Sequence, residues 1–542
     1  MPTANPRASY SPHAPACADT LDNTINAAPA PGPKAPGSRV RPGAWLRGLH
    51  RVHRVSGTVF ALWIALWFAS GAVMTFVNYP SFSARERLAH AAPLPVGREL
   101  HMPAAVRGFL RQGGLATGAR LRLAQLEGQP TWLFSHADRR YALRAVAPFD
   151  VAQLNEPRAR AELERQFGAC GGSATRLTQP DQWTVGRSDP GSYPLWKLSC
   201  GDRALSEFYL SARTGELVQH TTRAERVAAW FGPILHWVYP VELRRHAVLW
   251  RNVVLGLATL CLLVSLSGLC AGLCARIVVG RRRQSSAPAA RDAYLRWHQR
   301  LGLGFGLFAS TWLASGALSL EPFHWSGDSP SPRQLAALHA GAALAPESLP
   351  LTAALASCQR VSSVRELEIT QLGGLTLAIC SDAAGGTRLV DLADPQLRAQ
   401  PRLPTARLAE LGRTLVAAQG GFVLSEHAGP DAYYFATHRD ATPFPPFVRL
   451  ELADRDRTWL YLDPARAELV ASFTDKQRLA RWLFGGLHRW DFPGLYRQRW
   501  LWRGGMLVAM ALGFTLASLG AAMALRRRRR GVFTVRPART RS

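Results

Sequence analysis

The 542-residue chain lacks the sequence signatures of the common soluble cofactor and metal domains. No Gly-x-Gly-x-x-Gly run follows a strand pattern to open a helix, so we expect no fused nicotinamide or flavin domain. No Cys-x-x-Cys or His-x-x-x-His cluster occurs, which disfavours a zinc site built from closely spaced ligands. Acidic residues are few, 37 against 65 lysines and arginines, and none lies in a long apolar stretch. Their absence there disfavours a transporter with a charged site at the middle of the membrane.

Four stretches lack charge over a length sufficient to cross a bilayer. A hydrocarbon core of about 30 Å needs roughly 20 helical residues at about 1.5 Å each. The sequence therefore predicts a membrane protein with four transmembrane α-helices. The uncharged stretches are Val55–Tyr79, Asn252–Ala275, Leu301–Leu320 and Gly504–Leu525.

Clusters of arginine border these stretches mainly on one side. They lie at Arg47–Arg54, Arg276–Arg300 and Arg526–Arg530, and they outnumber Arg244, Arg245 and Arg251 on the other side. The positive-inside rule assigns the clustered side, and with it both termini, to the cytoplasm. Anionic lipid of the inner leaflet explains the net charge of +28, so we expect the lipid bilayer and no nucleic acid as partner.

The two halves of the membrane region repeat the same residues at the same spacing. In each half a histidine precedes a Ser-Gly pair by 17 residues, and a second histidine precedes a tryptophan by 14 residues. This internal repeat predicts two parallel repeats related by an axis along the membrane normal. The matched pairs are His53 with Ser70, His298 with Ser315, His236 with Trp250, and His488 with Trp502.

Two outward loops, of about 155 and about 165 residues, are each long enough for a folded domain. Both end in an alternating pattern typical of a β-hairpin, at Glu207–Val218 and Thr458–Val470. Upstream, Ala104–Gln112 and Thr405–Gln419 have helical periodicity. We therefore expect one small extracytoplasmic α+β domain in each loop.

Each outward loop also contains just two cysteines. An oxidising compartment permits a disulfide in each loop, and buried thiols are an equally good interpretation of the sequence. The two pairs are Cys170 with Cys200, and Cys358 with Cys380.

Taken together, these segments resemble the PepSY-associated transmembrane family. "LHRVHRVSGTVFALWIALWFASGAVM" and "LRWHQRLGLGFGLFASTWLASGALS" resemble its first helix, and His236 and His488 fall where it has a second histidine. "YLSARTGELV" and "YLDPARAELV" resemble the end of a PepSY domain. The resemblance covers about residues 45–530. It implies a multi-pass protein of the bacterial inner membrane, tied to iron uptake and similar to di-haem ferric-siderophore reductases.

The repeat axis places His53 opposite His298 at the inner side and His236 opposite His488 at the outer side. Two imidazoles that bind one haem iron have nitrogens about 4 Å apart. Ligands at opposite ends of spans that cover roughly 30 Å cannot share an iron. We therefore expect two haem b groups, although the alternative remains that these histidines cap helices or lie at the headgroup interface.

Three further residues are candidates for the same sites. His50, one turn before His53, competes for the inner ligand position, although Leu295 replaces it in the repeat. Arg251 and Arg503 match across the halves and would bind either haem propionates or lipid phosphate.

The expected function follows from the resemblance and the histidines. An unidentified electron donor would reduce the protein from the cytoplasm, and the protein would reduce a ferric siderophore or other ferric chelate in the periplasm. The competing hypothesis is a haem-free PepSY membrane anchor that binds or regulates a periplasmic partner.

The sequence predicts nine consecutive segments. Residues 1–44 contain no apolar core of a signal peptide and are expected to form a disordered cytoplasmic tail. The other segments are helix 1 (45–80), PepSY-like domain 1 (81–228), a juxtamembrane segment with helix 2 (229–276), a cytoplasmic loop (277–294), helix 3 (295–320), PepSY-like domain 2 (321–479), a juxtamembrane segment with helix 4 (480–526) and a basic tail (527–542).

Overall fold

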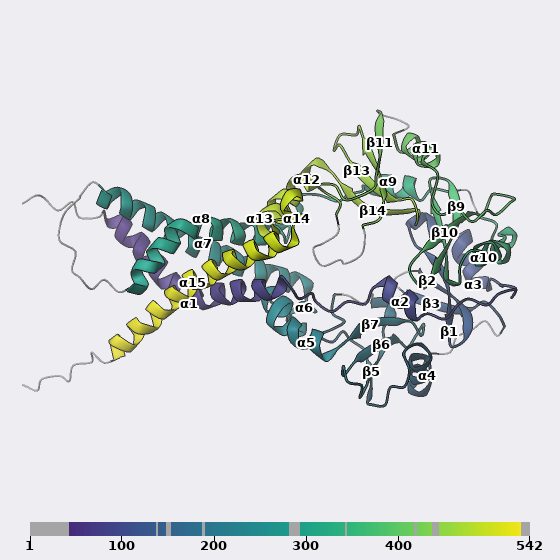
Figure 1. Ribbon diagram of the computed structural model, residues 1–542, viewed down its shortest axis with the longest axis horizontal. Helices are drawn as coiled ribbons and strands as arrows, with labels where there is room; N and C mark the ends of the chain where they lie inside the picture. Colours follow the sequence, from purple (N-terminus) through teal and green to yellow (C-terminus); the bar gives the residue numbers. More distant parts are fainter. Residues whose placement is uncertain are drawn as a thin grey trace, which may run out of the picture.

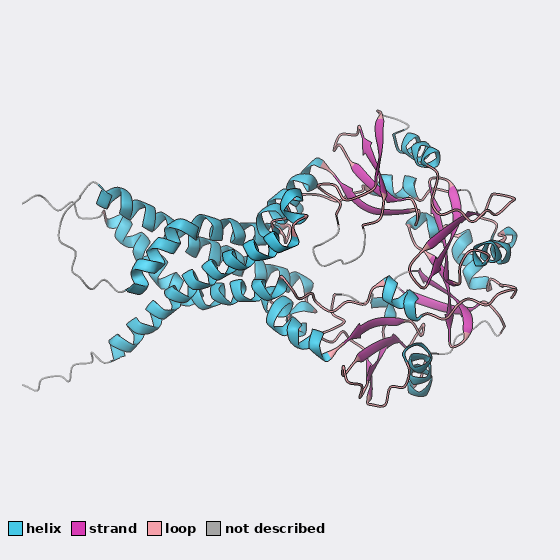
Figure 2. Ribbon diagram, viewed as in Figure 1, coloured by secondary structure: helices cyan, strands magenta, loops and turns pink. Residues whose placement is uncertain are grey.

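The computed structural model describes residues 43–136, 139–147, 153–186, 190–280, 293–341, 344–416, 420–435 and 444–532. Most of the expected N-terminal tail, of the 277–294 loop and of the 527–542 tail lies outside these residues. The described chain forms a long helical bundle with β-sheets gathered at one end (Figures 1 and 2).

Four helices of the bundle are long and apolar enough to cross a membrane, which confirms the four predicted spans. They are α1 (Ala44–Met74), α7 (Ala247–Gly280), α8 (Ala293–Leu318) and α15 (Arg499–Val532). Helix α1 lies against α7 and α15, and α8 lies against the same two helices. Helices α1 and α8 are therefore diagonal neighbours, and Phe68 of α1 and Trp312 of α8 are buried between them.

The outward loops are built differently from the expectation of one self-contained domain each. They share a six-stranded antiparallel sheet, because β1 of the first loop pairs with β8 of the second. Hydrophobic alternation predicts a strand but not which distant strand will pair with it, so the shared sheet could not be anticipated. Its strands, in order, are β10 (Thr387–Asp391), β9 (Leu375–Asp382), β8 (Val364–Leu372), β1 (Leu121–Leu126), β2 (Gln129–His136) and β3 (Arg139–Arg144).

Each loop adds a four-stranded sheet on its own side of this central sheet (Figure 2). Both sheets end in the predicted hairpins, β6–β7 and β13–β14, so the expectation of β-hairpins is confirmed. The strands are β4 (Ala174–Leu177), β5 (Leu195–Ser199), β6 (Glu207–Ser211) and β7 (Leu217–Thr221), then β11 (Phe422–His427), β12 (Phe447–Leu452), β13 (Trp459–Asp463) and β14 (Glu468–Phe473).

Shorter helices connect and cover the sheets. Helices α3 and α11 lie where helical periodicity predicted them. The α-helices are α2 (Ala84–His90), α3 (Ala104–Arg111), α4 (Glu156–Phe167), α5 (Arg223–Ala229), α6 (Val241–Arg244), α9 (Pro332–Leu338), α10 (Leu351–Gln359), α11 (Thr405–Val416), α12 (Asp475–Arg481), α13 (Leu487–Arg489) and α14 (Pro493–Tyr496). The 3₁₀ turns are η1 (Gly114–Thr117), η2 (Pro190–Ser192), η4 (Pro322–His324) and η5 (Pro346–Ser348), and the π-helices are η3 (Trp230–Ile234) and η6 (Trp482–Gly486).

The junction between β1 and β8 carries opposite charges on its two strands. Arg122 on β1 donates to Glu366 on β8 at 3.0 Å and also pairs with Glu216 in the β6–β7 turn. Glu366 further pairs with Arg87 of α2. Burial alone would raise the pKa of Glu216 and Glu366, but the surrounding arginines outweigh it and hold both pKa values below the ordinary range. Because the arginines come from the first loop and Glu366 from the second, the junction favours pairing between unlike halves.

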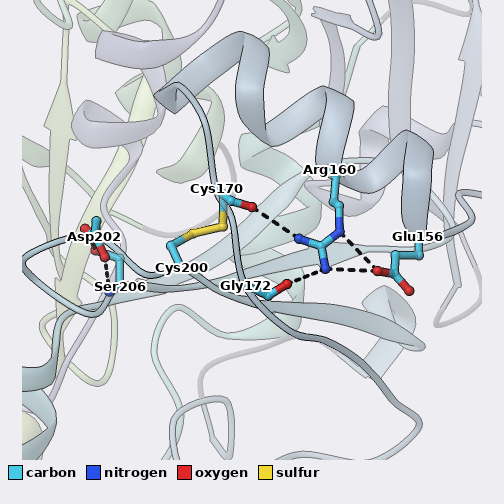
Figure 3. The surroundings of a disulfide bond; sticks show 7 residues. All are labelled: Glu156, Arg160, Cys170, Gly172, Cys200, Asp202 and Ser206. Atoms are coloured by element: carbon cyan, nitrogen blue, oxygen red, sulfur yellow. Dashed lines mark hydrogen bonds and ion pairs between the residues drawn. A yellow bond between two sulfur atoms is a disulfide. The ribbon is translucent and has the colours of Figure 1, made fainter.

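Both cysteine pairs form disulfides. The Cys170–Cys200 disulfide links the segment that follows α4 to the end of β5. The Cys358–Cys380 disulfide links α10 to β9. Arg160 of α4 lies beside the Cys170–Cys200 disulfide and donates hydrogen bonds to the carbonyl oxygens of Cys170, at 3.2 Å, and Gly172, at 2.6 Å (Figure 3). The sequence alone left disulfides and buried thiols open, and the structure resolves that choice.

Candidate functional site

The four histidines of the repeat lie in two facing pairs across the bundle. The ring centroids of His53 on α1 and His298 on α8 are 6.2 Å apart, with an interplanar angle of 32°. Those of His236 and His488 are also 6.2 Å apart, at 59°. All four rings are half-buried. The structure thus brings together the same partners that the repeat axis predicted.

One ring nitrogen of each histidine is held by a backbone carbonyl of a membrane helix. The Nδ1–O distances are 3.0 Å from His53 to Val264, 3.0 Å from His298 to Leu516, 3.2 Å from His236 to Trp67 and 3.1 Å from His488 to Trp312. A carbonyl can only accept, so Nδ1 carries the proton and Nε2 keeps its lone pair. Within the described chain no group hydrogen-bonds any of these four Nε2 atoms.

A glycine allows each ring to approach its helix. In every case it stands four residues after the carbonyl that accepts from Nδ1. A Cβ at Gly71, Gly316 or Gly520 would lie 3.1–3.3 Å from the Cε1 atom of His236, His488 or His298. A Cβ at Gly268 would lie 2.9 Å from Nδ1 and 3.0 Å from Nε2 of His53. The four sites therefore share one construction, a helix carbonyl and a glycine against which an imidazole edge packs.

The structure also explains the repeated 17-residue spacing. Ser70 Oγ lies 3.2 Å from Nδ1 of His236, and Ser315 Oγ lies 3.3 Å from Nδ1 of His488. Each repeated serine therefore contacts a histidine of the outer pair. The histidine 17 residues before that serine is a member of the inner pair. Ser267 contacts His53 in the same way, at 3.3 Å, although no repeated spacing marks it in the sequence.

The outer histidines are carried by matched π-helices. The π-helix Trp230–Ile234 ends two residues before His236, and Trp482–Gly486 ends two residues before His488. π-Helical turns are rare and occur frequently at functional sites. Both histidines precede the helices that span the membrane, α7 and α15, and Pro240 and Pro493 lie between each histidine and its spanning helix. No periodicity in the sequence signalled the π-helices.

Tryptophans fix the outer histidine segments in place. The indoles of Trp67 and Trp312 donate to the carbonyl oxygens of His236 and His488, at 2.8 and 3.0 Å. Those of Trp250 and Trp502 donate to the residue after each histidine, at 3.0 and 2.8 Å, which accounts for the 14-residue spacing.

The remaining candidates from the sequence lie apart from the pairs or differ between halves. His50 is exposed, and its Nδ1 bonds the carbonyl oxygen of Leu46 in its own helix at 2.8 Å. Arg503 is exposed with its guanidinium over the ring of Phe76, whereas Nε of Arg251 is buried without a hydrogen-bond partner. The two matched arginines therefore do not share one environment.

The geometry of both pairs fits an iron porphyrin with two axial imidazoles. Iron–nitrogen bonds of about 2 Å, with each ring centre about 1.2 Å behind its nitrogen, give centroids roughly 6.4 Å apart. The observed value is 6.2 Å in each pair. A carbonyl that accepts from Nδ1 is also the usual means of orienting a metal-binding histidine. Among the described residues no group of three or more histidine, cysteine or carboxylate side chains is placed to hold a metal ion.

No protein-family model matches the chain, and no curated protein matches it. The resemblance to the PepSY-associated transmembrane family therefore depends on the motif residues alone.

Proposed function

We propose that this chain is a di-haem b protein of the bacterial inner membrane, which passes electrons across the bilayer to reduce a ferric siderophore or ferric chelate outside. The observation that carries the proposal is the pair of facing histidine sites, in which Nδ1 of each ring bonds a helix carbonyl and Nε2 has no hydrogen-bond partner among the described residues.

The two sites lie at opposite ends of the bundle. His53 and Ser70, which contacts the outer pair, are 17 residues apart on α1, or about 25 Å along the helix axis. Between these levels Phe68, Phe305 and Trp312 fill the bundle interior with buried apolar surface. Such a core excludes water and ions, and therefore supports movement of electrons rather than of substrate through the bundle.

The chain's own residues would hold and orient the cofactor. His53 with His298, and His236 with His488, would supply the axial ligands, and the four helix carbonyls fix the tautomer in which Nε2 can bind iron. Bound haem would supply one-electron redox chemistry at each pair. Reduction of Fe(III) weakens its hold on hard oxygen ligands, which suits release of iron from a siderophore.

The orientation proposed here follows from charge. The end of the bundle opposite the sheets carries Arg51, Arg54, Arg296 and Arg300, which favours the cytoplasmic side for that end. The inner pair would then receive electrons from an unidentified donor, and the outer pair would face the acceptor beneath the sheets.

A second candidate is a haem-free anchor whose outer part binds a periplasmic partner. The large three-sheet assembly favours it, since such a surface suits protein binding as well as chelate docking.

One reoxidation assay distinguishes the two functions. Pre-reduced protein in vesicles should be reoxidised by a ferric siderophore added outside, and His488→Ala should slow this strongly while leaving the inner haem reducible. Reoxidation of that variant at the wild-type rate would remove the support for reduction at the outer site.

A further inference from the structure

Arg481 is a half-buried arginine for which the pseudo-symmetric first half has no counterpart. It is the last residue of α12 and directly precedes the π-helix that leads to His488. The matching position in the first half is the fully buried Ala229. The two halves therefore differ in charge at this position.

The guanidinium of Arg481 is fixed in position but only partly satisfied. Its Cζ lies 4.8 Å from the ring centre of Phe435 and 4.3 Å from that of Trp482, so two aromatic faces hold its plane. Nη2 donates to the carbonyl oxygen of Asp491 at 2.6 Å. Nε and Nη1 are inaccessible to solvent and have no hydrogen-bond partner among the described residues. Buried donors of this kind are rare in proteins, and an acceptor from outside the chain, a water or a ligand, would satisfy them.

Asp491 is the carboxylate beside these donors, but among the described residues no hydrogen bond joins Nε or Nη1 to it. Asp491 is almost fully buried and is held by Nε of Arg489 at 3.1 Å. Burial lowers the pKa of Arg481, and the charge of Asp491 offsets this only in part. Gly485 leaves room beside the free donors, because a Cβ there would approach Nη1 to 3.2 Å, whereas the first half has Pro233 at that position.

Arg481 also lies at a suitable height above the outer site. Seven residues separate it from His488 along one nearly continuous helical segment, which corresponds to about 10 Å. A guanidinium fork binds carboxylates through two parallel hydrogen bonds, and Arg481 has two adjacent donors to offer.

We propose that Arg481 is a carboxylate-binding residue of the outer site, whose Nε and Nη1 donate to one carboxylate group. That carboxylate belongs either to a propionate of the haem held by His236 and His488 or to a ferric chelate docked above it. The proposal rests on the proposed function and assigns a role to a residue that the repeat does not predict.

The test compares reduction potentials of the two haems in purified holoprotein. Arg481→Gln should lower the potential of one haem and leave the other unchanged, because a nearby positive charge stabilises the reduced form. Arg481→Lys keeps the charge but loses the fork, so its shift should be smaller and in the same direction. Arg457→Gln, which removes an exposed charge from the same outer region, is the matched control and should shift neither potential. The unchanged haem reports that each variant has folded.

A second arm identifies the source of the carboxylate. If both potentials are unchanged in Arg481→Gln, but several-fold more ferric citrate is needed for half-maximal reoxidation and ferric acetohydroxamate is unaffected, the carboxylate is that of the chelate. Unchanged potentials together with unchanged use of both chelates would overturn the proposal, as would an equal effect of Arg457→Gln. Wild-type protein that contains no haem would overturn the proposed function as well, a result that the variants cannot mimic.

Discussion

Replacing Gly268 by alanine tests the inner site through a single methyl group. Gly268 faces the ring of His53, and an added Cβ would come within 2.9 Å of Nδ1 and 3.0 Å of Nε2. Ordinary contacts of a Cβ begin near 3.4 Å. Cε1 of His53 would meet the added Cβ more closely still, so the imidazole edge would have to withdraw by more than about 0.5 Å, well beyond the roughly 0.2 Å tolerance of a metal–ligand bond.

The cost of this crowding can be worked from known overpacking. Forcing a methyl group into a packed site costs about 1–3 kcal/mol. If that cost falls on the haem-bound form, haem affinity at the inner pair drops by about 5-fold to 150-fold, at about 1.4 kcal/mol per tenfold. We therefore expect Gly268→Ala to lose most of one haem, or to retain it with an altered spectrum, while the outer haem is unaffected.

Gly256 provides the matched control on the same helix. A Cβ there meets nothing within 4 Å, so Gly256→Ala should keep both haems. The assay is haem content per chain, with the reduced-minus-oxidised spectrum of each variant. Two haems and an unaltered spectrum in Gly268→Ala would refute the reasoning, because His53 could not then be the ligand in the position described.

Four further predictions address the outer region, the inner ligand and the orientation. Glu366→Gln leaves Arg87 and Arg122 short of a buried partner and should destabilise the outer sheets by about 3–5 kcal/mol, measured by denaturant unfolding, whereas Glu410→Gln at an exposed pair should change stability by under about 0.5 kcal/mol. Since the folded-state pKa values of Glu216 and Glu366 are depressed, their stabilisation should be complete above the ordinary carboxyl pKa of about 4.3 and be lost as the pH falls through the lowered values; a stability that rises on acidification would contradict this. His53→Ala should remove one haem, whereas His50→Ala should remove none; the reverse result would move the inner ligand to His50. An alkaline phosphatase fusion after Arg530 should be inactive, and activity there would reverse the proposed orientation.

Much of the architecture could be predicted from local patterns in the sequence. The four spans, the two hairpins and helices α3 and α11 follow from hydrophobic periodicity within a single segment, and they lie where expected, except that α1 ends at Met74 and not at residue 80. The shared central sheet did not follow, because the pairing of β1 with β8 joins segments more than 200 residues apart. The charges that mark this junction, such as Arg122 and Glu366, are informative only once the two strands are known to meet.

The histidine pairs were predicted from repetition rather than from local pattern. Equal spacing in two halves implies equal depth in the membrane, and this places like residues opposite one another. The supporting residues were harder to foresee. Gly268 and Gly520 lie among many small residues of apolar helices, and their role depends on a ring from another helix. Ser70 was noticed as part of a repeat, but its partner, His236, lies in a different segment.

The central claim is that each chain holds two haems, and the number of haems per chain tests it most directly. Protein purified from haem-sufficient cells should contain two b-type haems per chain by the pyridine haemochrome assay, with two resolved steps in a potentiometric titration. A colourless protein that is folded, has both disulfides formed and takes up no added haem would contradict the account.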